Sequence, residues 1–437
     1  MKFQDLKLRD GLVRRLAQRG IERPTPIQEK ALPPALSGRD VLGVARTGTG
    51  KTLAFALPIA ERIPPSTRPG RAPRALVLAP TRELALQVAR ELDWLAEGLK
   101  VVAVYGGTGY QAQARALKAG ADVVVATPGR ARDYLKRGVL DLGEVEVAVL
   151  DEADEMLSMG FEEEVEALLG ATQRARQTLL FSATLPPWAR RLARRHLQDP
   201  AVADVSKHED VAYREEVYRV PARARVGVLS DLIHAKAPER AIVFVRTKVE
   251  AARVAEALDA RGHAARAVHG DLGQRDRERV LGAFRAGRTR VLVATDVAAR
   301  GLDVPEVDLV VHYQLPERAE AYQHRSGRTG RAGRGGTVAL LAEGGERHRV
   351  RRLEAAVGRR FARAELPSPE AARHARLRSL LERARSQPEA GKAAWREAAQ
   401  AWIAAGDAES LAGLLALLLE DRPPTATAAS PRPSARR

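Results

Sequence analysis

The sequence contains no cysteine among its 437 residues. Disulfides, thiol catalysis and Cys-ligated metal sites are therefore excluded, and a reducing compartment such as the cytoplasm is expected. Long apolar runs are also missing, because Leu411–Leu419 is about half the roughly 20 residues that a membrane-spanning helix needs. The first residues, Met1–Lys7, lack the apolar stretch of a signal peptide. We therefore expect no membrane segment.

Aromatic residues are scarce at 4% of the chain, which argues against a binding site that stacks many nucleic-acid bases. The net charge is strongly positive at +17, with 72 Lys and Arg against 55 Asp and Glu. Such a charge favours a polyanionic partner. Arg-rich compositions also occur in heat-stable or GC-biased proteins, so the charge alone does not decide between these explanations.

Short, unbroken apolar runs recur along the chain, each followed by a turn and then a helical pattern. Runs of this kind suit parallel strands buried on both faces, and their alternation with helices indicates an α/β fold. They fall into two series, which predict two α/β domains in tandem. The runs are Asp40–Ala45, Ala75–Ala79, Val101–Tyr105, Val123–Ala126, Val145–Leu150, Thr178–Phe181, Ala241–Val245, Ala265–Val268, Val291–Ala294, Leu309–His312 and Val338–Leu341.

Changes in composition divide the chain further. The segment between the two series is charged and non-periodic, and we interpret it as a linker. After the second series come three helical patterns, at 370–385, 389–405 and 407–420, and then a basic tail without Leu, Ile, Val or Phe that should be disordered. The expected segments are a first domain at 1–206, a linker at 207–218, a second domain at 219–365, a small all-α module at 366–420 and the tail at 421–437.

A phosphate-binding loop is predicted at Ala45–Thr52, between a short strand and a helical pattern. In such a loop, backbone N–H groups and the helix N-terminus surround phosphate oxygens. Lys51 would reach the β- and γ-phosphates, and the Thr52 hydroxyl would bind Mg²⁺. Ala45 stands where the strict pattern has Gly, so three of its four fixed positions match. The alternative is a glycine-rich turn followed by a chance Lys-Thr pair.

Three carboxylates, Asp151, Glu152 and Asp154, follow the apolar run Val145–Leu150. Beside a phosphate-binding loop, an Asp at a strand end suits Mg²⁺ binding, and the next Glu suits a general base. Acidic residues are also common at helix N-termini for electrostatic reasons alone. That alternative carries weight for Asp154 and Glu155, and less for the two acids before them.

The quartet Asp-Glu-Ala-Asp at 151–154 resembles the signature of the DEAD-box family of RNA-dependent ATPases. The resemblance extends over many motifs in the family's order, from residue 1 to about 365. It implies two RecA-like domains, ATP and Mg²⁺ as cofactors, and RNA as the partner. It also implies an ATP-dependent helicase that separates short RNA duplexes. The choice of RNA over DNA is implied by the resemblance alone.

The implied nucleotide site draws on both domains. Pro24–Gln28 resembles the family's Q motif, in which the Gln amide suits the edge of adenine. Ile21 stands where many members carry a stacking aromatic residue, which puts adenine selectivity in doubt. The residues implied to bind the nucleotide are Phe3, Gln28, Thr47, Gly48, Thr49, Gly50, Lys51, Thr52, Gly301 and Asp303.

Other motifs are implied to bind RNA or to couple it to hydrolysis. The RNA-facing residues are Thr81, Arg82, Gly107, Thr127, Arg130, Thr247, Gln274, Arg277 and Thr295. The coupling residues are Ser182, Thr184, Asp154 and His324. Arg328 and Arg331 resemble arginine fingers, which stabilise charge on the transferred phosphoryl group. Because Glu152 and these fingers lie in different domains, hydrolysis should depend on closure of the domains.

Residues 370–420 resemble the dimerisation module of the bacterial heat-resistant RNA-dependent ATPases. A homodimer is therefore expected, with Trp395 and Trp402 on one helix face as anchors. The alternative is a helical cap folded onto the second domain. Those proteins continue into a further RNA-binding domain, whereas 17 residues remain here, which puts targeting of structured RNA in doubt. The basic stretch Arg347–Arg363 supplies either nonspecific RNA affinity or only a solvated surface.

Two other functions fit much of this pattern. One is an ATP-gated RNA clamp or annealing protein, which would show RNA-stimulated ATP hydrolysis without unwinding. The other is an ATPase that acts on DNA, which DNA would stimulate more than RNA. A purely structural role is disfavoured, because Lys51, Glu152, Arg328 and Arg331 have no joint purpose without hydrolysis.

Overall fold

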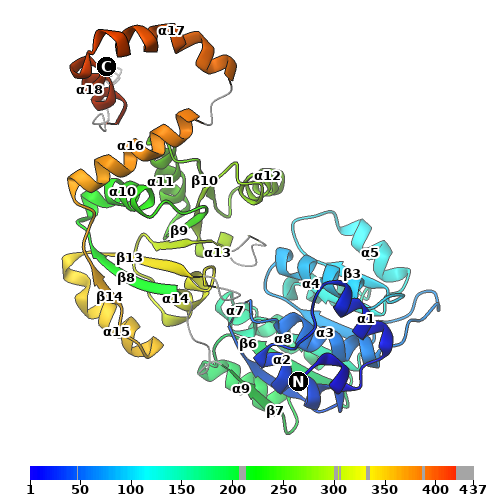
Figure 1. Ribbon diagram of the computed structural model, residues 1–437. Helices are drawn as coiled ribbons and strands as arrows, with labels where there is room; N and C mark the ends of the chain where they lie inside the picture. The colour runs from blue at the N-terminus through cyan, green and yellow to red at the C-terminus, as the bar shows by residue number, and fades with distance from the viewer. Residues whose placement is uncertain are drawn as a thin grey trace, which may run out of the picture.

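The computed structural model describes residues 1–46, 48–205, 213–299, 304, 307–330, 335–385 and 389–419. These residues form two α/β domains, followed by three helices (Figure 1). Each domain is built on a seven-stranded sheet in which every pairing is parallel. The predicted α/β class, with two tandem parallel-sheet domains and a helical C-terminal module, is confirmed.

The first domain has the strand order β3-β4-β2-β5-β6-β1-β7. Its strands are β1 Val41–Val44, β2 Ala75–Leu78, β3 Val101–Val104, β4 Val123–Ala126, β5 Val147–Leu150, β6 Gln177–Ser182 and β7 Ala201–Asp204. Its helices are the 3-10 turn η1 Phe3–Leu6, α1 Asp10–Gln18, α2 Pro26–Leu36, α3 Lys51–Arg62, α4 Arg82–Leu95, α5 Tyr110–Lys118, α6 Pro128–Lys136, α7 Ala153–Ser158, α8 Glu162–Gly170 and α9 Pro187–His196.

The second domain repeats this architecture with the strand order β10-β11-β9-β12-β13-β8-β14. Its strands are β8 Tyr213–Arg219, β9 Ala241–Val245, β10 Ala265–Val268, β11 Val291–Thr295, β12 Leu309–His312, β13 Gly336–Ala342 and β14 Ala362–Ala364. Its helices are the 3-10 turns η2 Ala222–Ala224 and η3 Gly344–Glu346, with α10 Arg225–Lys236, α11 Lys248–Ala260, α12 Gln274–Arg285, α13 Asp296–Ala299, α14 Ala319–Ser326 and α15 Arg347–Val357.

Most strands formed where apolar runs predicted them, because both faces of each sheet are covered; β7, β8 and β14 had no such run. In β2, Ala75 and Val77 point into one buried cluster, while Leu76 and Leu78 point into the other. The second sheet is likewise buried on both faces. When both faces of a strand are buried, apolar residues do not alternate with polar ones, so the strand appears in the sequence as a continuous apolar run.

The expected linker at 207–218 is wrong in its second half, because β8 begins at Tyr213 and pairs with both β13 and β14. The strand looked like a linker because it is charged. Its charges are paired inside the domain instead: Glu215 is 9% exposed and receives two hydrogen bonds from Arg359, at 2.7 and 2.8 Å. Pairing of this kind allows a carboxylate to be buried.

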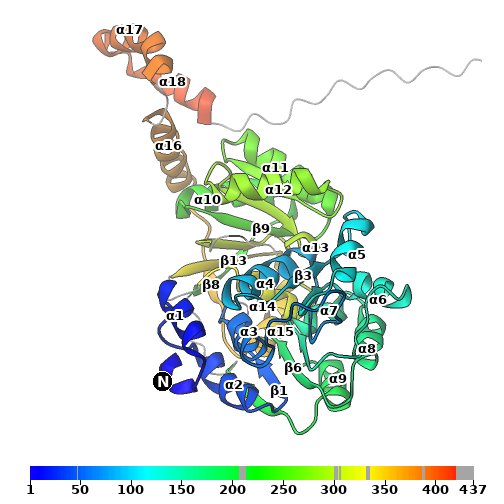
Figure 2. The same cartoon turned by 90° about the vertical axis from the view of Figure 1, so that its right-hand side faces the viewer.

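The C-terminal module consists of α16 Pro369–Arg385, α17 Glu389–Ala405 and α18 Ala408–Leu419, close to the three predicted helices. Helix α16 packs on α10, where Arg376 pairs with Asp231 at 2.6 Å and Ala375 is buried. Helices α17 and α18 project away from both domains (Figures 1 and 2). Among the described residues, no helix has both the length and the apolar character needed to cross a membrane.

We predict that Asp122→Asn destabilises the first domain by about 3 kcal/mol. Asp122 is fully buried and forms two hydrogen bonds with Arg71, at 2.5 and 2.7 Å, so the amide would leave a buried cation unpaired. The exposed pair Arg68–Glu144 supplies the control, and Glu144→Gln should cost under about 1 kcal/mol. Denaturant unfolding of both variants measures the difference; equal costs would contradict the prediction.

Candidate functional site

The predicted phosphate loop connects β1 to α3, as the motif requires. Gly48 and Gly50 adopt φ angles of 84° and 89°, in the left-handed region where a side chain would be strained. Helix α3 begins directly at Lys51, so the N–H groups of its first turn face the loop. The Thr49 hydroxyl donates to the Arg46 carbonyl at 2.8 Å. The chain thus builds a backbone cradle with a helix N-terminus behind it.

Gln28 supports this loop from inside the domain, whereas Phe3 lies in the hydrophobic core. Gln28 accepts from the Thr25 N–H at 2.9 Å and donates to the Gly50 carbonyl at 2.8 Å, so both ends of its amide are occupied. Phe3 is 2% exposed and lies in the hydrophobic core with Ile21 packed nearby. Because the Phe3 ring is covered on all sides by the core, it has no free face for a nucleotide to contact.

The acidic cluster lies at the end of β5, across from the phosphate loop. Asp151, Glu152 and Asp154 are all under 9% exposed, as is Lys51. Glu152 adopts φ 51° and ψ 51°, a left-handed conformation that costs energy for a residue with a side chain. This turn directs the chain from the strand into α7. The predicted juxtaposition of Lys51 with the acids is therefore present.

The electrostatics of this cluster suit a bound cation. Burial raises the pKa of Asp151 to about 7, although the charge of Lys51 opposes the rise. Burial also acts to raise the pKa of Glu152, but Lys51 and other neighbours outweigh it and the value is lowered. Within the described residues, Lys51 Nζ, Asp151 Oδ1 and Glu152 Oε2 are buried without a hydrogen-bond partner. Such atoms are costly unless a ligand satisfies them, so the residues fit a divalent cation and phosphate oxygens.

Asp154 is the point where several coupling residues meet. Its Oδ2 accepts from the Thr184 N–H and hydroxyl at 3.0 and 2.9 Å, and its N–H donates to Ser182 Oγ at 3.3 Å. His324, on α14 of the second domain, places Nε2 3.3 Å from the same Oδ2. One carboxylate of the first domain thus joins the Ser182–Thr184 turn to a residue across the cleft.

Arg328 follows α14 and lies near enough for its charge to help lower the pKa of Glu152. It is the one expected arginine finger that can be placed, because Arg331 lies outside the described residues, as do Thr47, Gly301 and Asp303. Thr52 is in the first turn of α3, beside Lys51. The predicted catalytic groups that are described therefore converge from both domains on one location.

The RNA-facing residues predicted in the first domain lie at the carboxyl ends of its strands. Thr81 caps α4 and accepts from the Leu84 N–H at 3.3 Å, while Thr127 precedes α6. Gly107, after β3, has φ 79°. The Arg130 guanidinium donates to the Thr108 carbonyl and lies 5.8 Å from the Tyr134 ring centroid.

The second domain presents a matching set. Thr247 caps α11 and accepts from the Glu250 N–H at 3.2 Å, and Thr295 is the last residue of β11. Gln274 begins α12 and donates to Glu278 at 2.8 Å. These residues also follow strands, so both sets lie where parallel α/β sheets bind ligands.

Two of the predicted RNA-binding arginines are held by carboxylates of the opposite domain. Arg82 lies 3.5 Å from Glu278, and Arg277 lies 3.4 Å from Glu83. Each partner is thus the residue next to the other arginine. The sequence analysis missed both glutamates, because no spacing along the chain shows which residues face each other across a cleft. These pairs connect the two domains through opposite charges.

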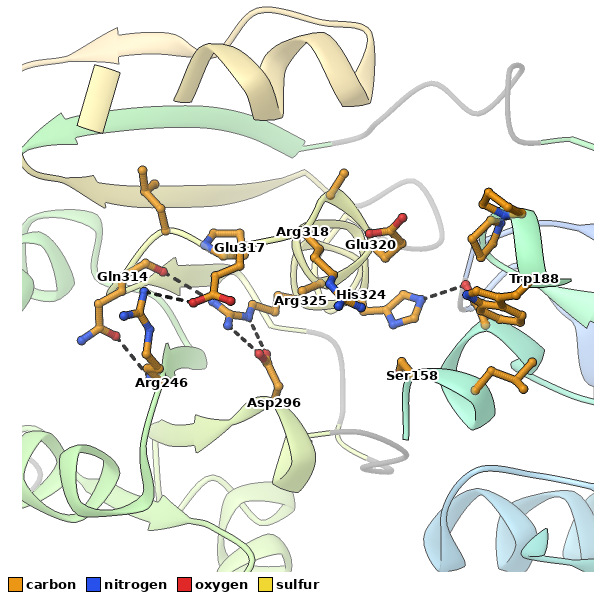
Figure 3. Close-up of a pocket in the computed structure, with 18 residues that line it drawn as sticks. Ser158, Trp188, Arg246, Asp296, Gln314, Glu317, Arg318, Glu320, His324 and Arg325 are labelled. Carbon is orange, nitrogen blue, oxygen red and sulfur yellow. Dashed lines mark hydrogen bonds and ion pairs between the residues drawn. The ribbon is translucent and has the colours of Figure 1, made fainter. Parts of the chain in front are cut away.

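A cavity of about 1020 Å³ lies between the domains, beside the contact of His324 with Asp154. Figure 3 shows Trp188 and Ser158 on the first-domain side and Arg246, Arg318 and Glu317 on the other. His324 points from α14 toward the first domain, whereas Arg325 points back to Asp296, with bonds of 2.5 and 2.7 Å. Neighbouring residues of α14 therefore face opposite ways: His324 contacts the first domain, and Arg325 anchors the helix to Asp296 of its own domain. The sequence analysis did not predict the Arg325–Asp296 pair.

We predict that the pKa of His324 lies above 6.5 and falls in an Asp154→Asn variant. Burial alone would lower this pKa, but the Asp154 carboxylate 3.3 Å away and the charges of Glu155 and Glu152 reverse the shift. The ion pair is therefore complete below 6.5 and is lost as the pH rises through the raised value. NMR titration of labelled histidine measures both values; a pKa that stays unchanged in the variant would contradict the assignment.

The chain matches three family models and many known proteins. A DEAD/DEAH box helicase model matches residues 25–192, a helicase conserved C-terminal domain model matches 224–333, and the dimerization-domain model of the RNA helicase Hera matches 367–418. The chloroplastic DEAD-box ATP-dependent RNA helicase 3B of Zea mays is 49% identical over 84% of this chain and 50% of its own length. The ATP-dependent RNA helicase DeaD of Klebsiella pneumoniae is 44% identical over 89% and 60%.

Solved structures agree with the sequence matches. Dbp5 of S. cerevisiae, bound to RNA and ADP BeF3, superposes with a TM-score of 0.75 at 29% identity, over 83% of this chain and 95% of that one. A DEAD box protein from Methanococcus jannaschii is 37% identical, with a TM-score of 0.50, over 83% and 99%. The chain spans about half of the Zea mays relative and six-tenths of the bacterial one. On these matches, the chain belongs to the DEAD/DEAH box helicase family.

Proposed function

We propose that this protein is an RNA-dependent ATPase that separates short RNA duplexes by closing its two domains. The observation that carries the proposal is the junction at Asp154, where His324 of the second domain contacts the acidic cluster of the first at 3.3 Å. Because Glu152 and Arg328 come from different domains, full activity requires both domains in place. RNA that binds both domains would favour this arrangement and so stimulate hydrolysis.

ATP is the proposed substrate and would lie in the cradle of Gly48–Gly50, with Lys51 on its phosphates. Thr52 and Asp151 would hold Mg²⁺, which supplies positive charge to the phosphates when bound. Glu152 would accept the proton of the attacking water, and Arg328 would offset charge on the phosphoryl group. The buried atoms without partners at Lys51, Asp151 and Glu152 support these roles. For Arg331, Thr47, Gly301 and Asp303 the roles remain predictions from the sequence.

RNA would bind across the carboxyl edges of both sheets. The proposed contacts are Thr81, Arg82, Gly107, Thr127, Arg130, Thr247, Gln274, Arg277 and Thr295. Hydroxyls, glycine N–H groups and guanidinium groups bind the phosphate backbone without reading bases, so sequence preference should be weak. The net charge of +17 supports an RNA partner. Arg82 and Arg277 would exchange Glu278 and Glu83 for phosphates, so binding should weaken steeply with salt.

The C-terminal module is proposed to join two chains into a homodimer. Trp395, Trp402 and Ile403 of α17 are 73%, 45% and 80% exposed, and Leu411 of α18 is 48% exposed. Apolar side chains gathered in this way favour a covering partner. The first helix, α16, packs on α10, so only α17 and α18 would extend to the second copy.

The cytoplasm is the proposed compartment, supported by the absence of cysteine.

The function is tested by Glu152→Gln. Removing the base should lower RNA-stimulated turnover by about 10²- to 10⁴-fold, while ATP binding stays close to wild type because the phosphate loop is intact. Steady-state hydrolysis and fluorescent-nucleotide binding measure the two quantities. Glu162→Gln, an exposed position at the start of α8, is the control. Turnover near the wild-type value would remove Glu152 as the base.

The dimer is tested by Ile403→Glu, which places a charge on the exposed apolar face of α17. We expect the dissociation constant to rise at least about tenfold, as for an interface anchor, with hydrolysis retained. Ala401→Glu adds the same charge about 160° around the helix from Ile403 and should leave the dimer intact. Light scattering over a concentration series measures both; a dimer unaffected by Ile403→Glu would contradict the proposed interface.

A further inference from the structure

Arg46 of the phosphate loop makes a contact across the domain boundary that none of the motif roles uses. Its Nη2 donates to the Tyr213 hydroxyl at 3.0 Å, and its guanidinium lies 5.2 Å from the Tyr213 ring centroid. Tyr213 is the first residue of β8, in the second domain, and is 7% exposed. A partly buried, charge-assisted hydrogen bond thus connects the loop of one domain to a strand of the other.

The Tyr213 hydroxyl is shared with a second arginine. Arg359 donates to it at 3.1 Å, with the guanidinium 5.7 Å from the ring on which Arg46 also acts. The same Arg359 forms a two-pronged pair with Glu215, two residues further along β8. A planar guanidinium held at two points by one carboxylate has little freedom to move. Arg359 and Glu215 of the second domain therefore fix the position of the Tyr213 hydroxyl.

Glu215 connects this pair to helix α14. It accepts the hydroxyl of Tyr322, a fully buried residue of α14 that lies two positions before His324. The Tyr322 ring stacks on His312 on one side, at 5.1 Å and 17°, and on Phe361 at 5.2 Å and 27°. Rings held in this way resist rotation, so a shift at Glu215 is transmitted to the helix.

We propose that Tyr213 is a positioning residue that links the phosphate loop to α14 through Arg359, Glu215 and Tyr322. Any loop arrangement that retains the Arg46–Tyr213 bond then stabilises the domain arrangement in which α14 presents His324 and Arg328 to the acidic cluster. This relay rests on the proposed function for its effect on turnover, but its geometry is independent of RNA.

The test is Tyr213→Phe in the full-length protein, which removes the hydroxyl and keeps the ring. RNA-stimulated kcat should fall roughly threefold to tenfold, as expected for one partly screened hydrogen bond to a charged group, while the affinity for fluorescently labelled ADP stays unchanged. The matched control is Tyr218→Phe. Tyr218 is on the same strand, is 4% exposed and donates its hydroxyl to Glu216 at 2.6 Å, outside the relay. It should retain the wild-type kcat.

The double variant Tyr213→Phe with Tyr322→Phe tests whether the two tyrosines belong to one chain of contacts. Its kcat should be no lower than that of the worse single variant, because residues in one network are not additive. Multiplied losses, a wild-type kcat in Tyr213→Phe, or an equal loss in Tyr218→Phe would each overturn the relay. Thermal unfolding of every variant separates these results from a folding defect.

Interdomain FRET without RNA keeps the relay separate from the proposed function. Tyr213→Phe should shift the population toward the open form, and Tyr218→Phe should not. If RNA fails to stimulate the wild-type protein, the proposed function falls, and this measurement still decides the relay. An unchanged FRET distribution in Tyr213→Phe would overturn it.

Discussion

The buried acidic cluster around Lys51 is the feature on which the rest of the structure depends. Burying Asp151, Glu152 and Asp154 next to one another is unfavourable, and one lysine does not compensate three carboxylates. The raised pKa of Asp151 and the buried atoms without partners express this imbalance. The first domain alone thus holds a strained site, with a left-handed Glu152 at its centre, that gains stability from added positive charge.

That charge comes in part from the second domain. His324 pairs with Asp154, and Arg328 acts on Glu152 through its charge. The reciprocal pairs of Arg82 with Glu278 and of Arg277 with Glu83 hold the same two domains on the predicted RNA face. Contacts at the proposed nucleotide site and at the proposed RNA face therefore both depend on how close the domains are. This shared dependence is the physical basis for coupling one site to the other.

Local patterns predicted most of the fold and of the cluster, because their causes are local. Apolar runs predicted the strands that are buried on both faces, and the glycine-rich loop predicted the cradle before Lys51. The prediction was wrong at β8, where Glu215 resembles a linker residue until its partner Arg359 is known. Gln28 and Phe3 were expected at the nucleotide. Gln28 bonds to the phosphate loop, so its contact with adenine stays a prediction, whereas the Phe3 ring is buried in the core. The partners of Arg46, Arg82 and Arg277 come from the opposite domain, and such contacts cannot be predicted from spacing along the sequence.

The central claim, that ATP and RNA together close the two domains, is tested most directly by measuring the distance between them. The chain has no cysteine, so Gln173→Cys and Glu256→Cys, at exposed positions in the two domains, can be labelled without background. We expect the largest high-FRET population when a non-hydrolysable ATP analogue and single-stranded RNA are both present, and a clearly smaller one without ligands, with either ligand alone or with DNA. A distance that is the same with and without these ligands would contradict the account.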